Sequence, residues 1–556
     1  MTLAILIIFM AVLSSIFRSL TPWAKQYKTE VEQHLSTLLG QPVTIQTMET
    51  GWYWFQPMLQ LHQVTLGADS QKIFRLNKLI VGINLFKSLW NWEILPGVLY
   101  IDDMHLTFRQ RGEHWTIDGI STDSINSEDM TPERTRQILS WLSQQERLII
   151  RHVSAYFYFN SGSIIPVNGL NVSILNQNGR YKIKGSARLE QTSSTDFQLL
   201  GDGYFNPEHF DEIEGKFYFS AQNIVPAQWQ YFIPKNKVSL EGGKGNLELW
   251  MDIHRGAVTS MHAQIELKRL AWRTMDNQKM RLVNYFFANL FWRPDSEGWE
   301  LSADQIHLRL GNSDWPENQL QIKFNREQQS YRIFVKNLLL NSLIPQLKDI
   351  NILQPLSALN PQGQLQDTQI LLVTQADSFQ IPAIAPLFHL PNPAEPLSEA
   401  HNLWSSRSEI TSLLSRFNNL GWEADAKDSI PKVNNLSGAI HWQPHEGRLE
   451  LDSTDTNIAL KNYPNQMFSQ INGSLDWKEL NDGYRVSVEH ILLNQPELTL
   501  SAQGILDQVQ PNSWGNMRFS VEYSGKNLQK WAKFLPKDKL KPKLYFWLTK
   551  DLRQVE

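Results

Sequence analysis

The chain has 556 residues, enough for three or four ordinary domains or for one long repetitive body. Its formal net charge is −4, from 52 Lys and Arg against 56 Asp and Glu, so no overall positive field favours binding to nucleic acid. The sequence has no cysteine, which excludes disulfides, thiolate metal sites and cysteine nucleophiles. The 20 Trp and 26 Phe, beside 29 Gly and 26 Pro, indicate many aromatic residues and turns and predict a β-rich fold.

An uncharged apolar run opens the chain, from Leu3 to Phe17, and ends at Arg18. The run is short for a bilayer span, which needs roughly 17 to 25 residues. A signal peptide would carry a basic start and a small-residue cleavage site, and the run has neither. We therefore predict an uncleaved transmembrane anchor over residues 1–20, with a signal peptide as the alternative. The apolar residues assigned to the anchor are Leu3, Ile5, Ile7, Phe9, Leu13 and Phe17.

The orientation of this anchor is open at this stage. Arg18, Lys25 and Lys28 follow the apolar run, and the positive-inside rule alone would keep that side in the cytoplasm. A large following domain, however, translocates largely regardless of its charge, and an upstream start codon would add a basic flank before the run.

Two helices are expected near the amino terminus. Thr21-Pro22 is a plausible helix start, and apolar residues at helical spacing, including Val31 and Leu35, predict a helix near residues 22–39 that ends before Gly40. Thr131-Pro132-Glu133 marks a second start and predicts a helix near residues 132–145.

Two later stretches alternate strictly between apolar and polar residues. Leu247 to Ile253 and Met261 to Leu267 each show this period of two, which places one side of a sheet against something apolar and the other against water. The candidate residues for an apolar lining are Leu247, Leu249, Met251, Ile253, Ile265 and Leu267.

An internal repeat of 35 residues extends this pattern toward the carboxyl terminus. Val433, Leu436, Gly438, Ile440 and Trp442 recur as Phe468, Ile471, Gly473, Leu475 and Trp477, and an earlier copy is Val283, Phe286, Ala288, Leu290 and Trp292. A second unit ends a strand in Asn plus an aliphatic residue and bends through a short helical turn to Pro; it occurs at Asn223, Asn337 and Asn527. Units of this size stack into an elongated body.

These repeats predict a division of the chain after the anchor. Residues 21–374 form the first part of a repetitive β structure, and residues 433–556 carry further β repeats that are truncated at the end. Residues 375–432 are an insertion, because a Pro-rich passage over 375–396 is followed by a helical pattern. That pattern consists of Leu403, Ile410, Leu414 and Phe417, and it predicts a helix resting on the sheet.

Three clusters contain residue types used in catalysis or metal binding, but each has a simpler explanation. Residues 241–245 contain Gly and Lys without the spacing of a P-loop, which favours a tight turn. His441 and His445 lie in a strand-and-turn stretch with Pro444, and Asp102, Asp103 and His105 suit a surface turn. We therefore predict no enzyme activity, no catalytic residues, no metal site and no cofactor.

Three segments together resemble the AsmA-like family of Gram-negative envelopes, specifically its YhdP type. They are L-x-x-L-x-G-x-P-V-x-I from Leu35 to Ile45, P-x-L-x-L-x-x-V-x-L from Pro57 to Leu66 after a Trp-containing turn, and Gly298-Trp299 to Trp315-Pro316. The resemblance covers essentially the whole chain and corresponds to the amino-terminal half of such proteins. It implies a mainly β fold: an elongated, curved antiparallel β-sheet groove with an apolar interior, anchored in the inner membrane with its bulk in the periplasm.

The resemblance also implies a function. A groove of this kind would bind phospholipid acyl chains, conduct phospholipid between inner and outer membrane, and maintain the outer-membrane permeability barrier, with inner- or outer-membrane proteins as further partners. From alternation alone, an ordinary closed β core is the expectation. The alternative is therefore an envelope scaffold or regulator with such a core, which binds protein or glycan partners on its outer face.

Overall fold

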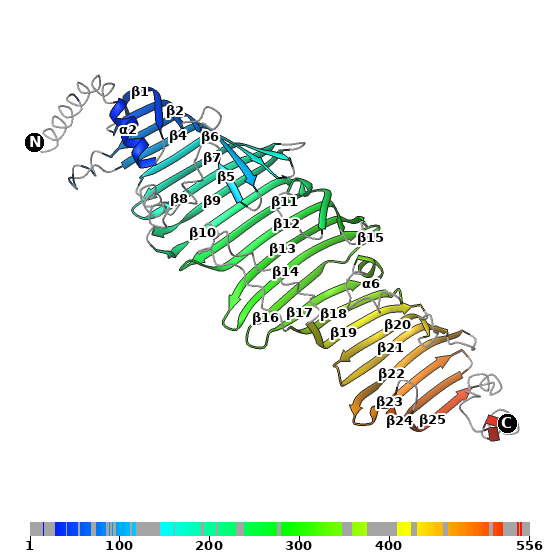
Figure 1. Cartoon of the computed structure of the whole chain (residues 1–556). Coiled ribbons are helices and arrows are strands. Elements are labelled where there is room, and N and C mark those ends of the chain that lie inside the picture. Colours follow the sequence, from blue (N-terminus) through cyan, green and yellow to red (C-terminus); the bar gives the residue numbers. More distant parts are fainter. Residues whose placement is uncertain are drawn as a thin grey trace, which may run out of the picture. The chain divides into compact units, whose positions relative to one another are not determined.

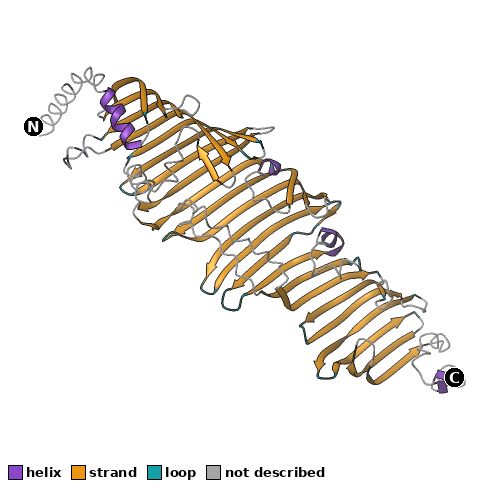
Figure 2. Ribbon diagram, in the orientation of Figure 1, coloured by secondary structure: helices purple, strands orange, loops and turns teal. Residues whose placement is uncertain are grey.

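A computed structural model describes most of the chain. The described residues are 28–39, 42–53, 56–67, 74–84, 96–111, 114–117, 145–160, 162–190, 194–206, 209–229, 238–274, 280–346, 359–374, 408–423, 431–459, 465–496, 498–510, 515–525 and the isolated positions 15, 88, 90, 92, 542, 543, 545 and 546. They are mainly β, as predicted, with few and short helices (Figure 2). Among them, no helix combines the length and apolar character needed to cross a membrane.

The chain forms two compact units that meet in sequence at Met280 and Arg281. The first unit contains helices α2 (Lys28–Leu39) and α5 (Pro226–Trp229) and the strands before β13 (Figure 1). These strands are β1 (Val43–Tyr53), β2 (Gln56–Leu66), β3 (Phe74–Ile83), β4 (Pro96–Arg111), β5 (His114–Ile117), β6 (Arg147–Tyr158), β7 (Ile164–Gln177), β8 (Arg180–Glu190), β9 (Ser194–Asn206), β10 (His209–Ile224), β11 (Val238–His254) and β12 (Ala257–Thr274).

The second unit begins with β13, whose first residue Met280 is counted with the first unit, and includes α6 (Leu340–Leu343) and a 3-10 turn, Ile344–Gln346. Its strands are β13 (Met280–Asp295), β14 (Gly298–Leu310), β15 (Ser313–Asp314), β16 (Asn318–Asn325), β17 (Ser330–Leu339), β18 (Gln362–Thr374), β19 (Ser408–Trp422), β20 (Lys432–Trp442), β21 (Glu446–Ala459), β22 (Gln466–Leu480), β23 (Gly483–Gln495), β24 (Leu498–Val509) and β25 (Asn516–Gly525).

Within each unit, strands that follow each other in sequence mostly pair antiparallel, as in a meander. The exception is β4, which pairs in parallel with β6 from Val98↔Arg147 to Arg109↔Tyr158, while β5 forms a short hairpin on the last residues of β4. The parallel pair needs a long crossover because both strands start at the same border of the sheet. The sequence pattern gave no sign of this pair.

Bulges interrupt many of the strands in both units. Non-glycine residues with a left-handed φ lie inside strands of both units; they include Gln63, Asp103, His152, Asn223, Arg269, Gln305, Asp367, Asn419, Asn435, Asp455 and Gln508. At several of them the strand register shifts. A bulge bends its strand and increases the local twist. We call these bulges, taken together within each unit, the bulge seam.

One predicted element was wrong. The helical pattern with Ile410, Leu414 and Phe417 lies in a strand, β19, and not in a helix. Bulges change the apolar spacing from two to three, so that Ile410 and Leu413 both face the same side, as do Phe417 and Leu420 around the left-handed Asn419. Leu414 lies on the opposite face, across from Gln369 and His441, so the steps of four and three from Ile410 through Leu414 to Phe417 combined residues of both faces and resembled a helix.

Other predicted elements have mixed outcomes. The helix near residues 22–39 is present as α2 in its described part. The Asn-aliphatic unit is confirmed at Asn223, where β10 ends before α5, and at Asn337, where β17 leads into α6. The anchor over residues 1–20, the helix near 132–145, the Pro-rich passage and the third Asn unit at Asn527 lie outside the described residues.

Candidate functional site

The strand register places the predicted lining residues on one face of the first unit. Leu249 lies opposite Phe219 of β10 and Ala263 of β12, and Leu247 lies opposite Ala221 and Ile265. The polar residues of the same strands occupy the other face. We call the two sides the apolar face and the outer face. All six candidates, which include Met251, Ile253 and Leu267, share the apolar face.

A single row of register partners shows how far this face extends. Each residue of the row is the Cα partner of the next, from β2 to β12: Leu59, Val81, Leu99, Leu148, Ile174, Ile183, Gly201, Phe217, Met251 and Met261. The one position without an apolar side chain is Gly201, where an added Cβ would lie 2.9 Å from the ring of Phe217. The aromatic ring therefore covers the glycine, and the row is apolar throughout. Nine strand spacings of about 4.8 Å give it a length of about 43 Å.

The second unit has a row of the same kind on its own apolar face. Its members, from β13 to β25, are Trp292, Leu301, Ile322, Ile333, Ile370, Leu413, Trp442, Gly447, Trp477, Val486, Leu506 and Met517. Here too a single glycine is covered, because a Cβ on Gly447 would lie 2.1 Å from the indole of Trp477. The row confirms the 35-residue repeat, since the repeated tryptophans Trp292, Trp442 and Trp477 all fall in it.

Most of the candidate residues remain partly exposed. Leu247, Leu249 and Met251 are half-buried, as are Ile265 and Leu267, whereas Ile253 is buried beside Ile213. Side chains in a closed core are normally buried on all sides. The described residues therefore leave much of the apolar face in contact with solvent, which differs from the closed core that alternation alone favoured.

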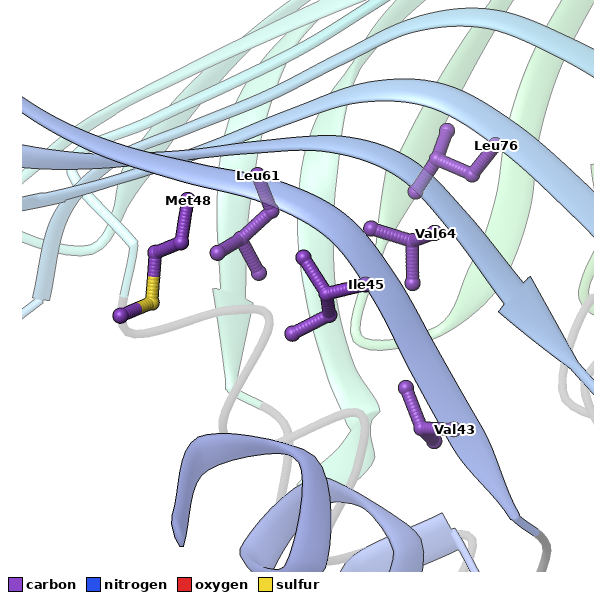
Figure 3. Close-up of a cluster of buried hydrophobic side chains, with 6 residues drawn as sticks. All are labelled: Val43, Ile45, Met48, Leu61, Val64 and Leu76. Carbon is purple, nitrogen blue, oxygen red and sulfur yellow. The ribbon is translucent and has the colours of Figure 1, made fainter. Parts of the chain in front are cut away.

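The amino-terminal end of the apolar face is thoroughly covered. Figure 3 shows six buried side chains on the side of the strands that faces α2. They are Val43, Ile45, Met48, Leu61, Val64 and Leu76, each 6% exposed or less. Val31 and Leu35 of α2 pack against this cluster, which explains why the amphipathic pattern of the helix was visible in the sequence.

Several buried polar groups lie on the apolar face beside bulges. The Thr456 hydroxyl, fully buried, and the Ser453 hydroxyl donate hydrogen bonds of 3.0 and 2.9 Å to the carbonyl of Asn435. Thr195 donates in the same way to the carbonyl of Asn223. A buried carbonyl without a partner is costly, and bulges remove ladder partners, so these hydroxyls satisfy the backbone. Sequence reasoning missed them; an isolated Ser or Thr at an apolar position of a strand was the available signal.

The outer face carries charged and aromatic pairs. Trp250 stacks on His262 with ring centroids 4.9 Å apart, and Tyr218 lies 5.2 Å away on the other side. Arg448 pairs with Glu450, Asp476 and Glu489. Hydrogen bonds from Ser474 and then Arg448 hold the pKa of Glu489 below its usual value. Exposed pairs of this kind add little stability, but they keep this face polar.

The three weak chemical clusters lie within strands or beside them, and two of them are not turns as expected. Residues 241–245 lie inside β11 at two register shifts, and Asp102, Asp103 and His105 lie inside β4. Burial raises the pKa of Asp102, but hydrogen bonds from His152 and Tyr100 outweigh it and lower that pKa overall. His445 pairs with Glu479 and not with His441. Within the described residues, no three His, Asp or Glu side chains gather as metal ligands.

Comparison with known proteins identifies the family of the chain that carries this apolar face. A model of the family described as "YhdP protein" matches residues 1–555. The chain belongs to the YhdP family. Over 330 residues it is 20% identical to the "Intermembrane phospholipid transporter YhdP" of Escherichia coli (strain K12), a match that covers 59% of this chain and 25% of that relative. No solved structure matches. The resemblance noted in the sequence is thereby confirmed.

Proposed function

We propose that this YhdP-family protein is an envelope protein that binds phospholipid acyl chains along its apolar face and conducts phospholipid between the inner and outer membranes. In this proposal the run from Leu3 to Phe17 anchors the chain in the inner membrane, the bulk lies in the periplasm, and the bulge seam curves the sheet into a groove. The observation that carries the proposal is the unbroken apolar row of each unit, with side chains that remain partly exposed.

The energetics favour this use of the face. Each methylene removed from water contributes about 0.8 kcal/mol, so an acyl chain of about 16 carbons gains on the order of 10 kcal/mol on an apolar surface. Any polar gap in the path would return part of the chain to water. The row of the first unit, at about 43 Å, exceeds the roughly 30 Å thickness of a bilayer core and has no such gap. Outward transport and support of the outer-membrane barrier are part of the proposal.

Transport along such a face requires no reacting group. We propose that the protein is not an enzyme, and that lipid moves passively unless a membrane partner supplies energy. The E. coli relative is named as an intermembrane phospholipid transporter, which supports this class of function.

Photo-crosslinking in cells tests the proposal at two adjacent positions. A photoreactive residue at Leu249 lies on the apolar face between Phe219 and Ala263, whereas one at Trp250 lies on the outer face. We expect phospholipid adducts at Leu249 and none at Trp250. Adducts at neither position, with protein adducts at Trp250, would contradict lipid transport and support the scaffold.

A further inference from the structure

Two tryptophans of the second unit have buried indole N–H groups without an acceptor. Trp292 of β13 and Trp299 of β14 are half-buried side chains, and their Nε1 atoms are shielded from solvent. Within the described residues, neither nitrogen has a hydrogen-bond partner. An indole nitrogen can only donate, and a buried donor without an acceptor is costly. We call these two residues the tryptophan pair; an acceptor from a ligand would remove this cost.

The tryptophan pair lies on the apolar face beside a turn. Trp292 is opposite Leu301 and Trp299 is opposite Pro294, so the two indoles are diagonal neighbours across β13 and β14. Diagonal positions of a strand pair are about 7 to 8 Å apart, within reach of aromatic side chains. Both residues lie at the strand ends that the turn over residues 295–298 joins. The two donors therefore stand together where the apolar face meets a border of the sheet.

Other tryptophans of the same unit find their acceptors in the chain. Trp315 donates from Nε1 to the Ser342 hydroxyl at 2.9 Å, and Trp422 donates to the carbonyl of Pro431 at 2.8 Å. The side chains opposite the tryptophan pair, a leucine and a proline, contain no acceptor. A bound molecule can supply the acceptor that these neighbours lack.

The cations beside the tryptophan pair serve the outer face. Arg293 pairs with Glu300 at 2.7 Å, and Lys323 pairs with Asp295 at 2.8 Å. An anion on the apolar face would lie among apolar side chains without these partners, which is costly. A neutral carbonyl oxygen lies there at a lower cost and still accepts a hydrogen bond from an indole. The chemistry of the site therefore favours an ester over a phosphate.

We propose that the tryptophan pair donates hydrogen bonds to the ester carbonyls of a phospholipid bound along the apolar face. The proposal rests on the proposed lipid transport and adds the ester linkage to what this face recognises. A diacyl phospholipid has two ester carbonyls between its apolar chains and its head group, and their place in the lipid matches two donors between an apolar face and its border. Trp299 packs against the rings of Phe324 and Tyr331, so rotation of side chains alone brings its N–H to a lipid acceptor.

Two lipids that differ only in this linkage test the proposal. A photoreactive residue replaces Ile322, which lies opposite Leu301, the partner of Trp292, and the purified full-length protein receives equal amounts of diester and diether phosphatidylethanolamine with the same chain lengths. The diether lipid keeps the head group and the apolar chains but has no carbonyl acceptor. We expect diester adducts to exceed diether adducts about tenfold, as two neutral hydrogen bonds would give. A probe at Leu506, in the same row on β24, should show no preference.

Substitutions of tryptophan separate the N–H groups from the apolar surface. Trp292→Phe combined with Trp299→Phe keeps aromatic rings but removes both donors, so the preference for the diester lipid at Ile322 should disappear. Trp442→Phe, in the same row, is the matched control and should keep the preference, because Trp442 is not among the described residues with a buried, unpaired nitrogen. Equal adducts of the two lipids on the unsubstituted pair, or a preference that survives in the double variant, would overturn the proposal and leave lipid transport standing. Absence of lipid adducts at both Ile322 and Leu506 would contradict lipid transport itself, and this proposal with it.

Discussion

The first and last described strands, β1 and β25, differ in how far their apolar side chains are covered. At β1, α2 both covers the apolar face and caps the edge, since Glu32 accepts from the Ile45 amide at 2.7 Å and Ser36 from the Val43 amide at 2.8 Å. At β25, the apolar side chains are 42% exposed or more and the outer side of the strand has no described strand partner. The apolar face is therefore covered by the chain's own helix at β1, whereas Met517, Phe519 and Val521 of β25 remain partly exposed.

The difference in covering predicts the largest contrast between the two ends. Leu61 is 2% exposed beneath α2, so Leu61→Ala should lower the free energy of local unfolding by about 2 to 5 kcal/mol through the lost burial and the cavity left behind. Phe519→Ala should cost about 1 kcal/mol or less, because much of the ring is already in water. Hydrogen–deuterium exchange of β1–β3 and β24–β25 peptides measures both. Similar costs at the two ends would show that α2 does not seal the amino-terminal end.

The cap on β1 predicts a smaller effect. Glu32→Ala removes the acceptor of the Ile45 amide and should cost about 1 to 3 kcal/mol in the local opening of β1, seen as faster amide exchange at Ile45. Glu32→Gln keeps an acceptor oxygen and should lose less. The matched control is Glu30→Ala, an exposed residue of the same helix turn, which should change exchange little. Unchanged exchange at Ile45 in Glu32→Ala would mean that α2 does not cap the edge.

Acidification gives the smallest effect and acts at the carboxyl-terminal end. A hydrogen bond from Arg485, with the charges of Arg485 and Arg518, holds the pKa of Asp507 below its usual value although burial opposes this. The folded-state pKa thus lies below the unfolded one, so the ion pair stabilises the fold above about pH 4 and this contribution is lost as pH falls through the folded pKa. In thermal unfolding between pH 6 and pH 3, the difference between wild type and Asp507→Asn should shrink toward low pH. A constant difference would contradict the assignment.

The sequence predicted strands correctly where apolar and polar residues alternate without interruption. The stretches Leu247–Ile253 and Met261–Leu267 were predicted to alternate between the two sides of a sheet, and they do, with a register shift only at the end, between Asp252 and Ile253. The 35-residue repeat predicted strands that occupy equivalent positions, as the row with Trp442 and Trp477 shows. Local periodicity reports the face of a strand reliably when the period stays at two.

The predictions that failed involve strands with bulges and strands that pair across a long stretch of sequence. β19 was expected to be a helix because Ile410, Leu414 and Phe417 follow helical spacing, although they lie on both faces of the strand. Residues 241–245 were expected to be a turn, although they form a bulge inside β11. The parallel pairing of β4 and β6 depends on contacts about 50 residues apart in sequence, which no local pattern encodes. The hydroxyls of Thr456 and Ser453 were missed because their role follows from a carbonyl that only the folded strand leaves without a ladder partner.

The bulge seam also constrains how proteins of this kind can gain or lose strands in evolution. Each strand that crosses the seam carries its own bend, and nearby hydroxyls, such as those of Ser453 and Thr456, satisfy the backbone locally. Insertion of one strand would reverse the direction of every strand after it and exchange the borders on which the short turns lie. Insertion or loss of a whole hairpin, about 35 residues, preserves direction, bend and apolar row together. Duplication and deletion in steps of two strands are therefore the evolutionary changes that this architecture tolerates best.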